Sequence, residues 1–245
     1  MARPGIDAHS IVYHLGEGKQ TSSNDRRIRA RLERRLAKNP EIDLYIRLAY
    51  FEAKQQNWDL AQKAIQSALK MDPKHRDAML LNAQILESKG ETQKAKQAYQ
   101  SVIEHHPDFS KAYREYGRFF MRKESLLDLA QTYLLRALEL RPKDALAHLL
   151  LAEVFIQRDR QNQGLLHLEI AKRFQDEEPL FHRRSVPLFL KLDQYEEAIQ
   201  QLRKALKYDP KDKKIRTQLR QLEKMCKQKK EPKEKSQQFW KRWKT

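Results

Sequence analysis

Hydrophobic positions recur along this chain in pairs of short amphipathic segments. In SKAYREYGRFFMRKESLLDLAQTYLLRALELRP, residues 110–142, apolar side chains return at helical spacing in two stretches, and a proline closes the unit. The closing prolines Pro73, Pro107, Pro142 and Pro210 stand 34, 35 and 68 residues apart. A fixed period in this range is typical of stacked helical repeats. The pattern predicts an all-α chain whose function lies on a stacked surface and not in an enclosed catalytic pocket.

Small residues occupy the positions where the two helices of each unit are expected to cross. A close crossing leaves room only for a small side chain, and large apolar residues one turn away fill the space beside it. The first helices carry Ala49, Ala83, Gly117 and Ala152 at this point, and the second helices carry Ala61, Ala95, Ala130 and Ala198.

These positions resemble those of the tetratricopeptide repeat family. The unit endings Asp72-Pro73, His106-Pro107, Arg141-Pro142 and Asp209-Pro210 fit the family pattern, as do Ala68, Ala137, Ala171 and Ala205 five residues before each close. The resemblance covers roughly residues 41–210. It implies a right-handed superhelical α-α solenoid of about five repeats, with helical caps at both ends. It also implies a non-catalytic scaffold or adaptor that binds a partner segment in a concave groove.

The chain departs from the family pattern at a few places. Asp176 replaces a closing proline, Gly164 replaces the early alanine of a second helix, and the third unit has one extra residue between its helices. These departures bear on the angle between repeats there and not on the assignment of the repeats. Pro187 falls inside a first helix, where proline removes an amide donor, and it predicts a kink or a late helix start.

The pattern divides the chain into five parts. We expect an irregular arm over residues 1–23, a capping helix over 24–40, five repeats over 41–211, a second capping helix over 212–228 and a basic aromatic tail over 229–245. Each cap covers one open end of the stack. The expected buried positions of the caps are Ile28, Leu32 and Leu36 in the first and Ile215, Leu219, Leu222 and Met225 in the second.

Positive charge gathers at the two ends of the chain. The net charge is +17, of which residues 1–40 carry +5 and residues 211–245 carry +10. An array that binds nucleic-acid phosphates along its length would itself be basic, so the near-neutral repeats argue against this use. Basic termini that bind a membrane surface or nucleic acid, with the array as a spacer, remain the competing function.

Composition points to the cytoplasm. The sequence has no long uncharged apolar run, its start MARPGIDAHSIVYHLGEG does not resemble a secretory signal, and the single cysteine, Cys226, fits a reducing compartment. We therefore expect a cytoplasmic protein, with a peripheral membrane contact through the tail left open. Self-association also stays open.

The first helices supply the candidate groove residues. In the third unit four cations stand on one helical face at spacings of three, four and four, namely Lys111, Arg114, Arg118 and Arg122. The other units add Tyr50, then Asp77, Leu80, Gln84 and Glu87, then Leu146, Leu149, Glu153 and Ile156. We hypothesise that this groove holds a partner segment with acidic and hydrophobic residues. The alternative is a solvated face balanced by nearby glutamates.

The family's clamp for a chaperone's C-terminal carboxylate is not expected here. It needs paired Lys and Asn on successive first helices, and those places hold Ile46 and Tyr50, then Leu80 and Leu81. None of these four residues is the lysine or asparagine that the clamp needs.

The tail interleaves Phe239, Trp240 and Trp243 with lysine and arginine. Three aromatic side chains exposed on one segment favour a binding contact with a ligand or partner. A protein pocket, an anionic membrane surface, single-stranded nucleic acid and an idle tail all stay open, with nucleic acid the least favoured contact.

No residue cluster with catalytic or metal-binding spacing is evident. His105 and His106 are adjacent, so their side chains diverge on a helix, and His148, His167 and His182 lie apart without a cysteine or carboxylate at ligand spacing. We expect no enzymatic activity, no cofactor and no metal.

Overall fold

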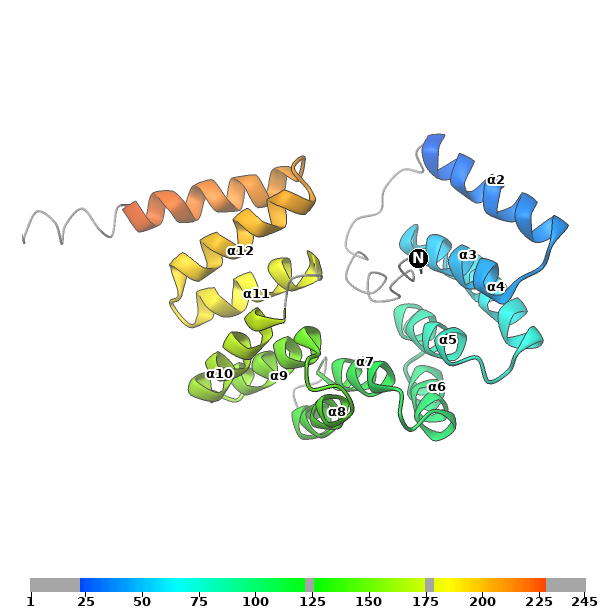
Figure 1. The fold of residues 1–245 in the computed structure, drawn as a ribbon, viewed down its shortest axis with the longest axis horizontal. Helices are drawn as coiled ribbons and strands as arrows, with labels where there is room; N and C mark the ends of the chain where they lie inside the picture. Colours follow the sequence, from blue (N-terminus) through cyan, green and yellow to red (C-terminus); the bar gives the residue numbers. More distant parts are fainter. Residues whose placement is uncertain (1–22, 122–125, 175–178, 228–245) are drawn as a thin grey trace, which may run out of the picture. The chain divides into compact units, whose positions relative to one another are not determined.

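The computed structural model describes residues 23–121, 126–174 and 179–227 of the chain (Figure 1). Its described residues form α-helices joined by short connections, with no strand among them. The chain divides into two compact units, residues 1–142 (unit 1) and 143–245 (unit 2). Residues 1–22 of the arm predicted over 1–23, and the tail over 229–245, lie outside the described residues, whereas Ser23 begins α2.

Each predicted repeat holds one pair of packed helices. Unit 1 contains α2 (Ser23–Lys38), α3 (Ile42–Lys54), α4 (Trp58–Met71), α5 (Arg76–Ser88), α6 (Thr92–His105), α7 (Ser110–Phe120) and α8 (Leu127–Leu140). Unit 2 contains α9 (Ala145–Gln157), α10 (Gln161–Arg173), α11 (Pro179–Lys191), α12 (Tyr195–Tyr208) and a last helix over 213–227. The tightest packing joins α3 to α4, α5 to α6, α7 to α8, α9 to α10 and α11 to α12. The predicted all-α repeat architecture is therefore confirmed.

The small residues lie at the helix crossings, as predicted. Ala49, Ala83 and Ala152 in first helices and Ala61, Ala95 and Ala130 in second helices have no exposed surface. A Cβ atom on Gly117 of α7 would lie 2.8 Å from Leu134 Cγ and 3.1 Å from the Ala130 carbonyl oxygen of α8. Glycine therefore allows α7 and α8 to approach more closely than an alanine would.

A left-handed residue closes the first helix of four repeats. Gln56, Gly90, Asp159 and Asp193 have φ values of 63°, 81°, 60° and 56°. In each case the next amide, as in Asn57 N to Glu52 O at 2.9 Å, bonds back over five residues to the helix. This is a Schellman cap, which satisfies the last carbonyls of the first helix and turns the chain into the second.

Gly164 has a local partner that explains the departure from alanine. Its Cβ would lie 2.5 Å from Cγ1 of Ile156 in α9, so Ile156 fills the space that an alanine methyl takes in the other repeats. Pro187 lies within α11, which begins at Pro179 and runs on to Lys191. A late start after Pro187 is therefore wrong.

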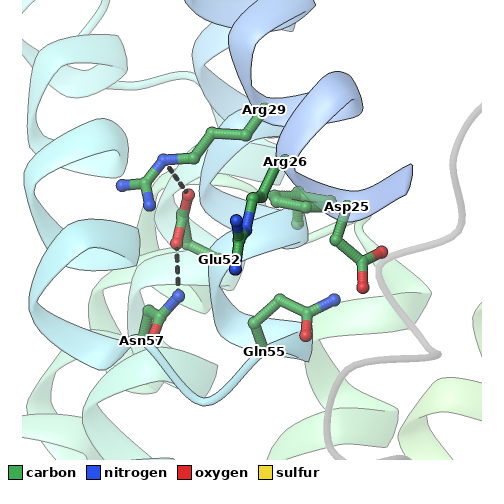
Figure 2. Close-up of a pocket in the computed structure, with 7 residues that line it drawn as sticks. Asp25, Arg26, Arg29, Glu52, Gln55 and Asn57 are labelled. Atoms are coloured by element: carbon green, nitrogen blue, oxygen red, sulfur yellow. Dashed lines mark hydrogen bonds and ion pairs between the residues drawn. The ribbon is translucent and has the colours of Figure 1, made fainter. Parts of the chain in front are cut away.

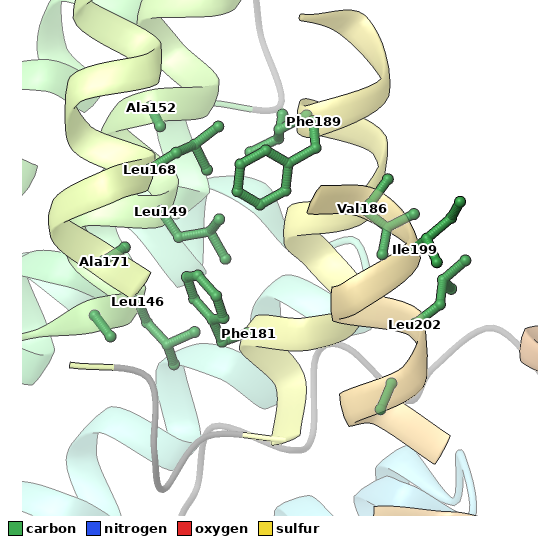
Figure 3. Packing of buried hydrophobic residues seen from close by; sticks show 14 of the residues in the cluster. Leu146, Leu149, Ala152, Leu168, Ala171, Phe181, Val186, Phe189, Ile199 and Leu202 are labelled. Atoms are coloured by element: carbon green, nitrogen blue, oxygen red, sulfur yellow. The ribbon is translucent and has the colours of Figure 1, made fainter. Parts of the chain in front are cut away.

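The core of unit 2 runs across α9, α10, α11, α12 and the last helix. Leu149, Leu168, Phe181, Phe189 and Leu202 meet in it (Figure 3). Ile215 and Leu222 of the last helix are buried in the same cluster, and Leu219 and Cys226 pack against it.

Met225 is 45% exposed, and Cys226 packs against the core in place of the Met225 that the sequence predicted there. The buried stripe follows spacings of four, three and four residues, which keep one face of a helix toward the core.

The first capping helix packs on α3. Leu36 of α2 is buried at 8% exposure, whereas Ile28 is 40% exposed, so the predicted apolar face of α2 is covered only toward its C-terminal end. None of the described helices is long and apolar enough to cross a membrane.

Candidate functional site

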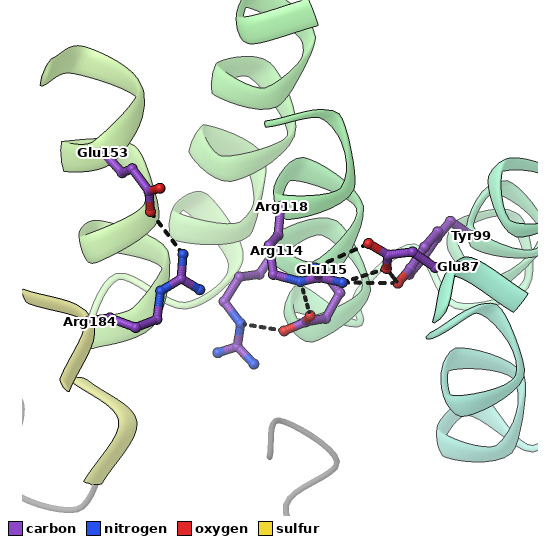
Figure 4. A network of polar contacts seen from close by, with 7 residues as sticks. All are labelled: Glu87, Tyr99, Arg114, Glu115, Arg118, Glu153 and Arg184. Atoms are coloured by element: carbon purple, nitrogen blue, oxygen red, sulfur yellow. Dashed lines mark hydrogen bonds and ion pairs between the residues drawn. The ribbon is translucent and has the colours of Figure 1, made fainter. Parts of the chain in front are cut away.

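Buried charged side chains link α5 to α7 in unit 1 (Figure 4). Arg118 of α7 donates from Nη1 and Nη2 to the two carboxylate oxygens of Glu87 in α5, at 3.2 and 2.5 Å. Its Nε donates to Glu115 Oε2 at 2.8 Å. Tyr99 of α6 donates its hydroxyl to Glu87 Oε2 at 2.8 Å. This network joins the first helices of two successive repeats.

The network is electrically balanced. Arg114 Nε lies 3.4 Å from Glu115 Oε1, so two arginines face two glutamates. The four side chains are at most 7% exposed. Burial, and then the negative charge of Glu87, raise the pKa of Tyr99 well above its usual range, so its hydroxyl stays protonated and donates.

An amide with unmet hydrogen bonds stands on the same face of α5. Gln84 has no exposed surface, and neither its Nε2 nor its Oε1 has a hydrogen-bond partner among the described residues. Gln84 precedes Glu87 by three residues and Ser88 by four, so the three side chains share one face of the helix. The Ser88 hydroxyl is also buried without a partner in the described part of the chain. We call Gln84, Glu87 and Ser88 of α5 with Arg114 and Arg118 of α7 the α5–α7 polar face.

The predicted row of accessible cations is wrong where the structure describes it. Arg114 and Arg118 are 2% and 4% exposed and are ion-paired within the chain. Lys111 is half-buried, and Arg122 lies outside the described residues. Because Glu87 and Glu115 already neutralise the two arginines, the row gives no reason to expect an acidic partner. Tyr50 of α3 is half-buried and packs against the core of unit 1.

The predicted groove residues of the fourth repeat serve unit 2 itself. Leu146 and Leu149 are buried core residues, and Ile156 is half-buried against the same core. Leu146 and Leu149 therefore serve the core, and a partner contact at Ile156 stays a prediction. Glu153 of α9 accepts a hydrogen bond from Arg184 Nη2 of α11 at 2.8 Å (Figure 4), which ties these two first helices together. The tail residues Phe239, Trp240 and Trp243 lie outside the described residues.

A pocket of about 300 Å³ lies between α2 and the end of α3 (Figure 2). Glu52, which is 1% exposed, accepts a hydrogen bond from Asn57 Nδ2 at 2.7 Å and lies 3.1 Å from Arg29 Nε. Arg29 also donates to Glu33 at 3.1 Å. The buried carboxylate therefore fixes α2 on the first repeat.

Two histidines meet inside the fourth repeat. The Nδ1 atoms of His148 in α9 and His167 in α10 are 3.0 Å apart, so one ring donates and the other accepts. The ring of His167 stacks on Phe155 with centroids 5.4 Å apart. Burial, and then the neighbouring His148, lower the pKa of His167 to about 4. No group of three or more His, Cys, Asp or Glu in the described residues could hold a metal ion.

The sequence places Gln84 and Glu87 on one face of a first helix but does not show that Glu87 pairs with Arg118. Glu87 and Arg118 are 31 residues apart, three short of a full repeat, so each lies on the first helix of its own repeat. That separation is the signal that could have paired them. The hydroxyl contact of Tyr99 with Glu87 cannot be read from spacing.

Helical pairs that follow one another and pack together within each unit define a helical-repeat protein. Models of the tetratricopeptide repeat match residues 52–116, 122–179 and 188–212, together more than half of the chain. The chain belongs to the tetratricopeptide repeat family, whose members generally mediate protein–protein interactions. No curated protein matches it in sequence.

Solved structures share the fold at low sequence identity. A tetratricopeptide repeat protein of Thermus thermophilus, TTC0263, matches with a TM-score of 0.64 at 20% identity, over 74% of this chain and 98% of its own. A chain of the APC/C hetero-tetramer Cut9-Hcn1 matches with a TM-score of 0.64 at 17% identity, over 82% of this chain and 40% of its own. PilF of Pseudomonas aeruginosa matches with a TM-score of 0.56 at 22% identity, over 68% of this chain and 75% of its own.

Proposed function

We propose that unit 1 binds an extended segment of a partner protein at the α5–α7 polar face. The observation that carries the proposal is the Gln84 amide, which is fully buried with its donor and its acceptor both unsatisfied among the described residues. An unmet buried polar group costs about 1–3 kcal/mol, so a protein that keeps one has a use for it. A peptide group of an extended chain offers one donor and one acceptor, the complement of a glutamine side chain.

The neutral network sets what kind of segment fits. Glu87 and Glu115 balance Arg114 and Arg118, and all four are held by charge-assisted bonds. The partner segment therefore needs no acidic residue to answer the arginines. We propose that it is read mainly through its main chain, with apolar side chains placed beside the aromatic residues of this region. Tyr99 and Tyr116 stack there with ring centroids 5.4 Å apart.

Binding at this face has an energetic cost. Its side chains are buried in the structure, so a partner segment binds only those molecules in which this face is exposed. The measured affinity is therefore reduced by the fraction of molecules in that state. A moderate affinity that responds to competition suits an adaptor. Catalysis has no part in this proposal.

Peptide affinity of a glutamine variant tests the proposal. Peptides selected from a random 12-residue display library on the full chain are measured by fluorescence anisotropy against Gln84→Leu, which keeps the shape and removes the amide. The matched control is Gln97→Leu, an exposed glutamine on α6. We expect at least a tenfold loss of affinity for Gln84→Leu and less than a twofold change for Gln97→Leu. Equal affinities for all three proteins would refute the proposed site.

A further inference from the structure

The outer face of α2 carries a row of cations that form no ion pair with a described acidic residue. Arg27, Arg31, Arg34, Arg35 and Lys38 are all exposed, and they have no ion pair among the described residues. At 3.6 residues per turn these five positions fall within roughly 100° of one another, along about 16 Å of helix. The acids of α2 lie elsewhere, since Glu33 pairs with Arg29 and Asp25 lines the pocket beside α3.

This row costs stability. Five pairs of like charges at spacings of three or four residues each disfavour the helix by about 0.2–0.5 kcal/mol. The helix is held in place by other contacts, namely the Arg29–Glu52 ion pair and the burial of Leu36. A surface that needed charge only for solubility would mix both signs. The row therefore points to an anionic partner.

We propose that the outer face of α2 binds the phosphodiester backbone of a nucleic acid. Four of its five cations are arginines, whose planar fork matches phosphate oxygens. A duplex presents one negative charge about every 1.7 Å of its axis, so on the order of ten phosphates lie along the row. The near-neutral repeats speak against nucleic-acid binding along the array, but α2 precedes the array.

A membrane surface fits this helix less well. A helix that lies in the lipid interface inserts its apolar face. In α2 that face is turned to the rest of the unit, with Leu36 buried and Leu32 half-buried, which leaves Ile28 as the exposed large apolar residue of the helix. Charge alone holds lipid headgroups only weakly, whereas charge is the main term for a nucleic-acid backbone.

The salt dependence of binding measures the contact directly. The affinity of the full chain for fluorescein-labelled 25-nucleotide RNA and 25-base-pair DNA is measured at several salt concentrations by anisotropy. The variants are Arg27→Gln/Arg31→Gln/Arg34→Gln and a matched control on the last helix, Arg220→Gln/Lys224→Gln/Lys227→Gln, which removes the same charge from exposed positions. The two nucleic acids distinguish the possible sources of the same phosphate chemistry.

We expect the α2 variant to bind at least tenfold more weakly and its log–log salt slope for DNA to shrink by about 2.7, which is 0.9 for each lost contact. Its melting temperature should stay equal or rise, because repulsion is relieved. The control should lose less than threefold. Equal or larger losses in the control, or loss of sedimentation with phosphatidylserine vesicles while nucleic-acid binding persists, would overturn the proposal.

Discussion

Among the described residues two glycines, Gly117 and Gly164, stand at helix contacts, and each has a different neighbour. Gly117 faces Leu134 and the Ala130 carbonyl oxygen of α8, whereas Gly164 faces Ile156 and the Ala152 carbonyl oxygen of α9. The first is a contact between helices that only glycine permits. The second is a local exchange, in which a larger residue on α9 is matched by a smaller one on α10.

Gly164→Ala should therefore destabilise the chain by about 1–3 kcal/mol, since the added methyl meets Ile156 Cγ1 at 2.5 Å. In an Ile156→Ala background the same change should cost less than it does in the parent chain, because the contact with Ile156 Cγ1 is gone and only the Ala152 carbonyl oxygen, at 3.2 Å, remains close. Urea denaturation of the four proteins gives the coupling energy. Additive effects would show that the two positions do not compensate each other.

The ion pair between α5 and α7 makes Glu87 a sensitive position. Glu87→Gln removes one partner of a buried charge and leaves Arg118 short of its carboxylate, at a cost of about 3 kcal/mol. Glu139→Gln, which breaks an exposed pair with Arg136, should cost less than about 0.5 kcal/mol. Both values come from chemical denaturation, and similar losses for the two variants would contradict the buried network.

His167 should make stability depend on pH. Its pKa is about 4 in the folded chain and 6.5 in the reference state, so between these values the unfolded chain binds more protons. Stability should therefore fall as the pH drops from about 6.5 to 4, by about 2 kcal/mol after allowing for partial exposure. His167→Phe keeps the stacking on Phe155 and should lose less stability over this range. Parallel profiles of the two proteins in pH-dependent urea denaturation would rule this contribution out.

At the scale of elements, periodicity predicted the helices well because it reports burial. The recurring small residues and closing prolines placed the five helical pairs that the structure describes. Side-chain partners were harder to predict. Arg114 and Arg118 occupy groove positions in the sequence, yet their charge is answered by Glu115 and Glu87. Contacts between repeats depend on how the hairpins pack, which spacing alone does not determine.

The last helix separates a core position from its exposed neighbour. Leu222→Ala should cost about 2–4 kcal/mol, because Leu222 is 7% exposed within the core of unit 2. Met225→Ala, at a position 45% exposed, should change stability by less than about 0.5 kcal/mol. Circular dichroism during urea denaturation measures both. A larger loss of stability for Met225→Ala than for Leu222→Ala would support the sequence-based prediction that Met225 faces the core.

At the scale of the whole molecule, charge and apolar contacts serve different parts of the chain. The repeats are almost neutral and hold themselves together through alanine contacts and a few buried ion pairs, while most of the net charge of +17 lies in the terminal segments. A chain organised in this way can offer a neutral face to a partner segment and a basic helix to an anion. The two proposals thus concern different surfaces and fail independently.

The melting temperature of Gln84→Leu tests the central claim most directly. If the buried amide is kept for a ligand, replacing it by leucine removes an unsatisfied group, and the free protein should melt higher by about 2–6 °C while losing peptide affinity. A lower melting temperature would mean that the Gln84 amide is already satisfied within the fold. The α5–α7 polar face would then be a structural network and not a binding site.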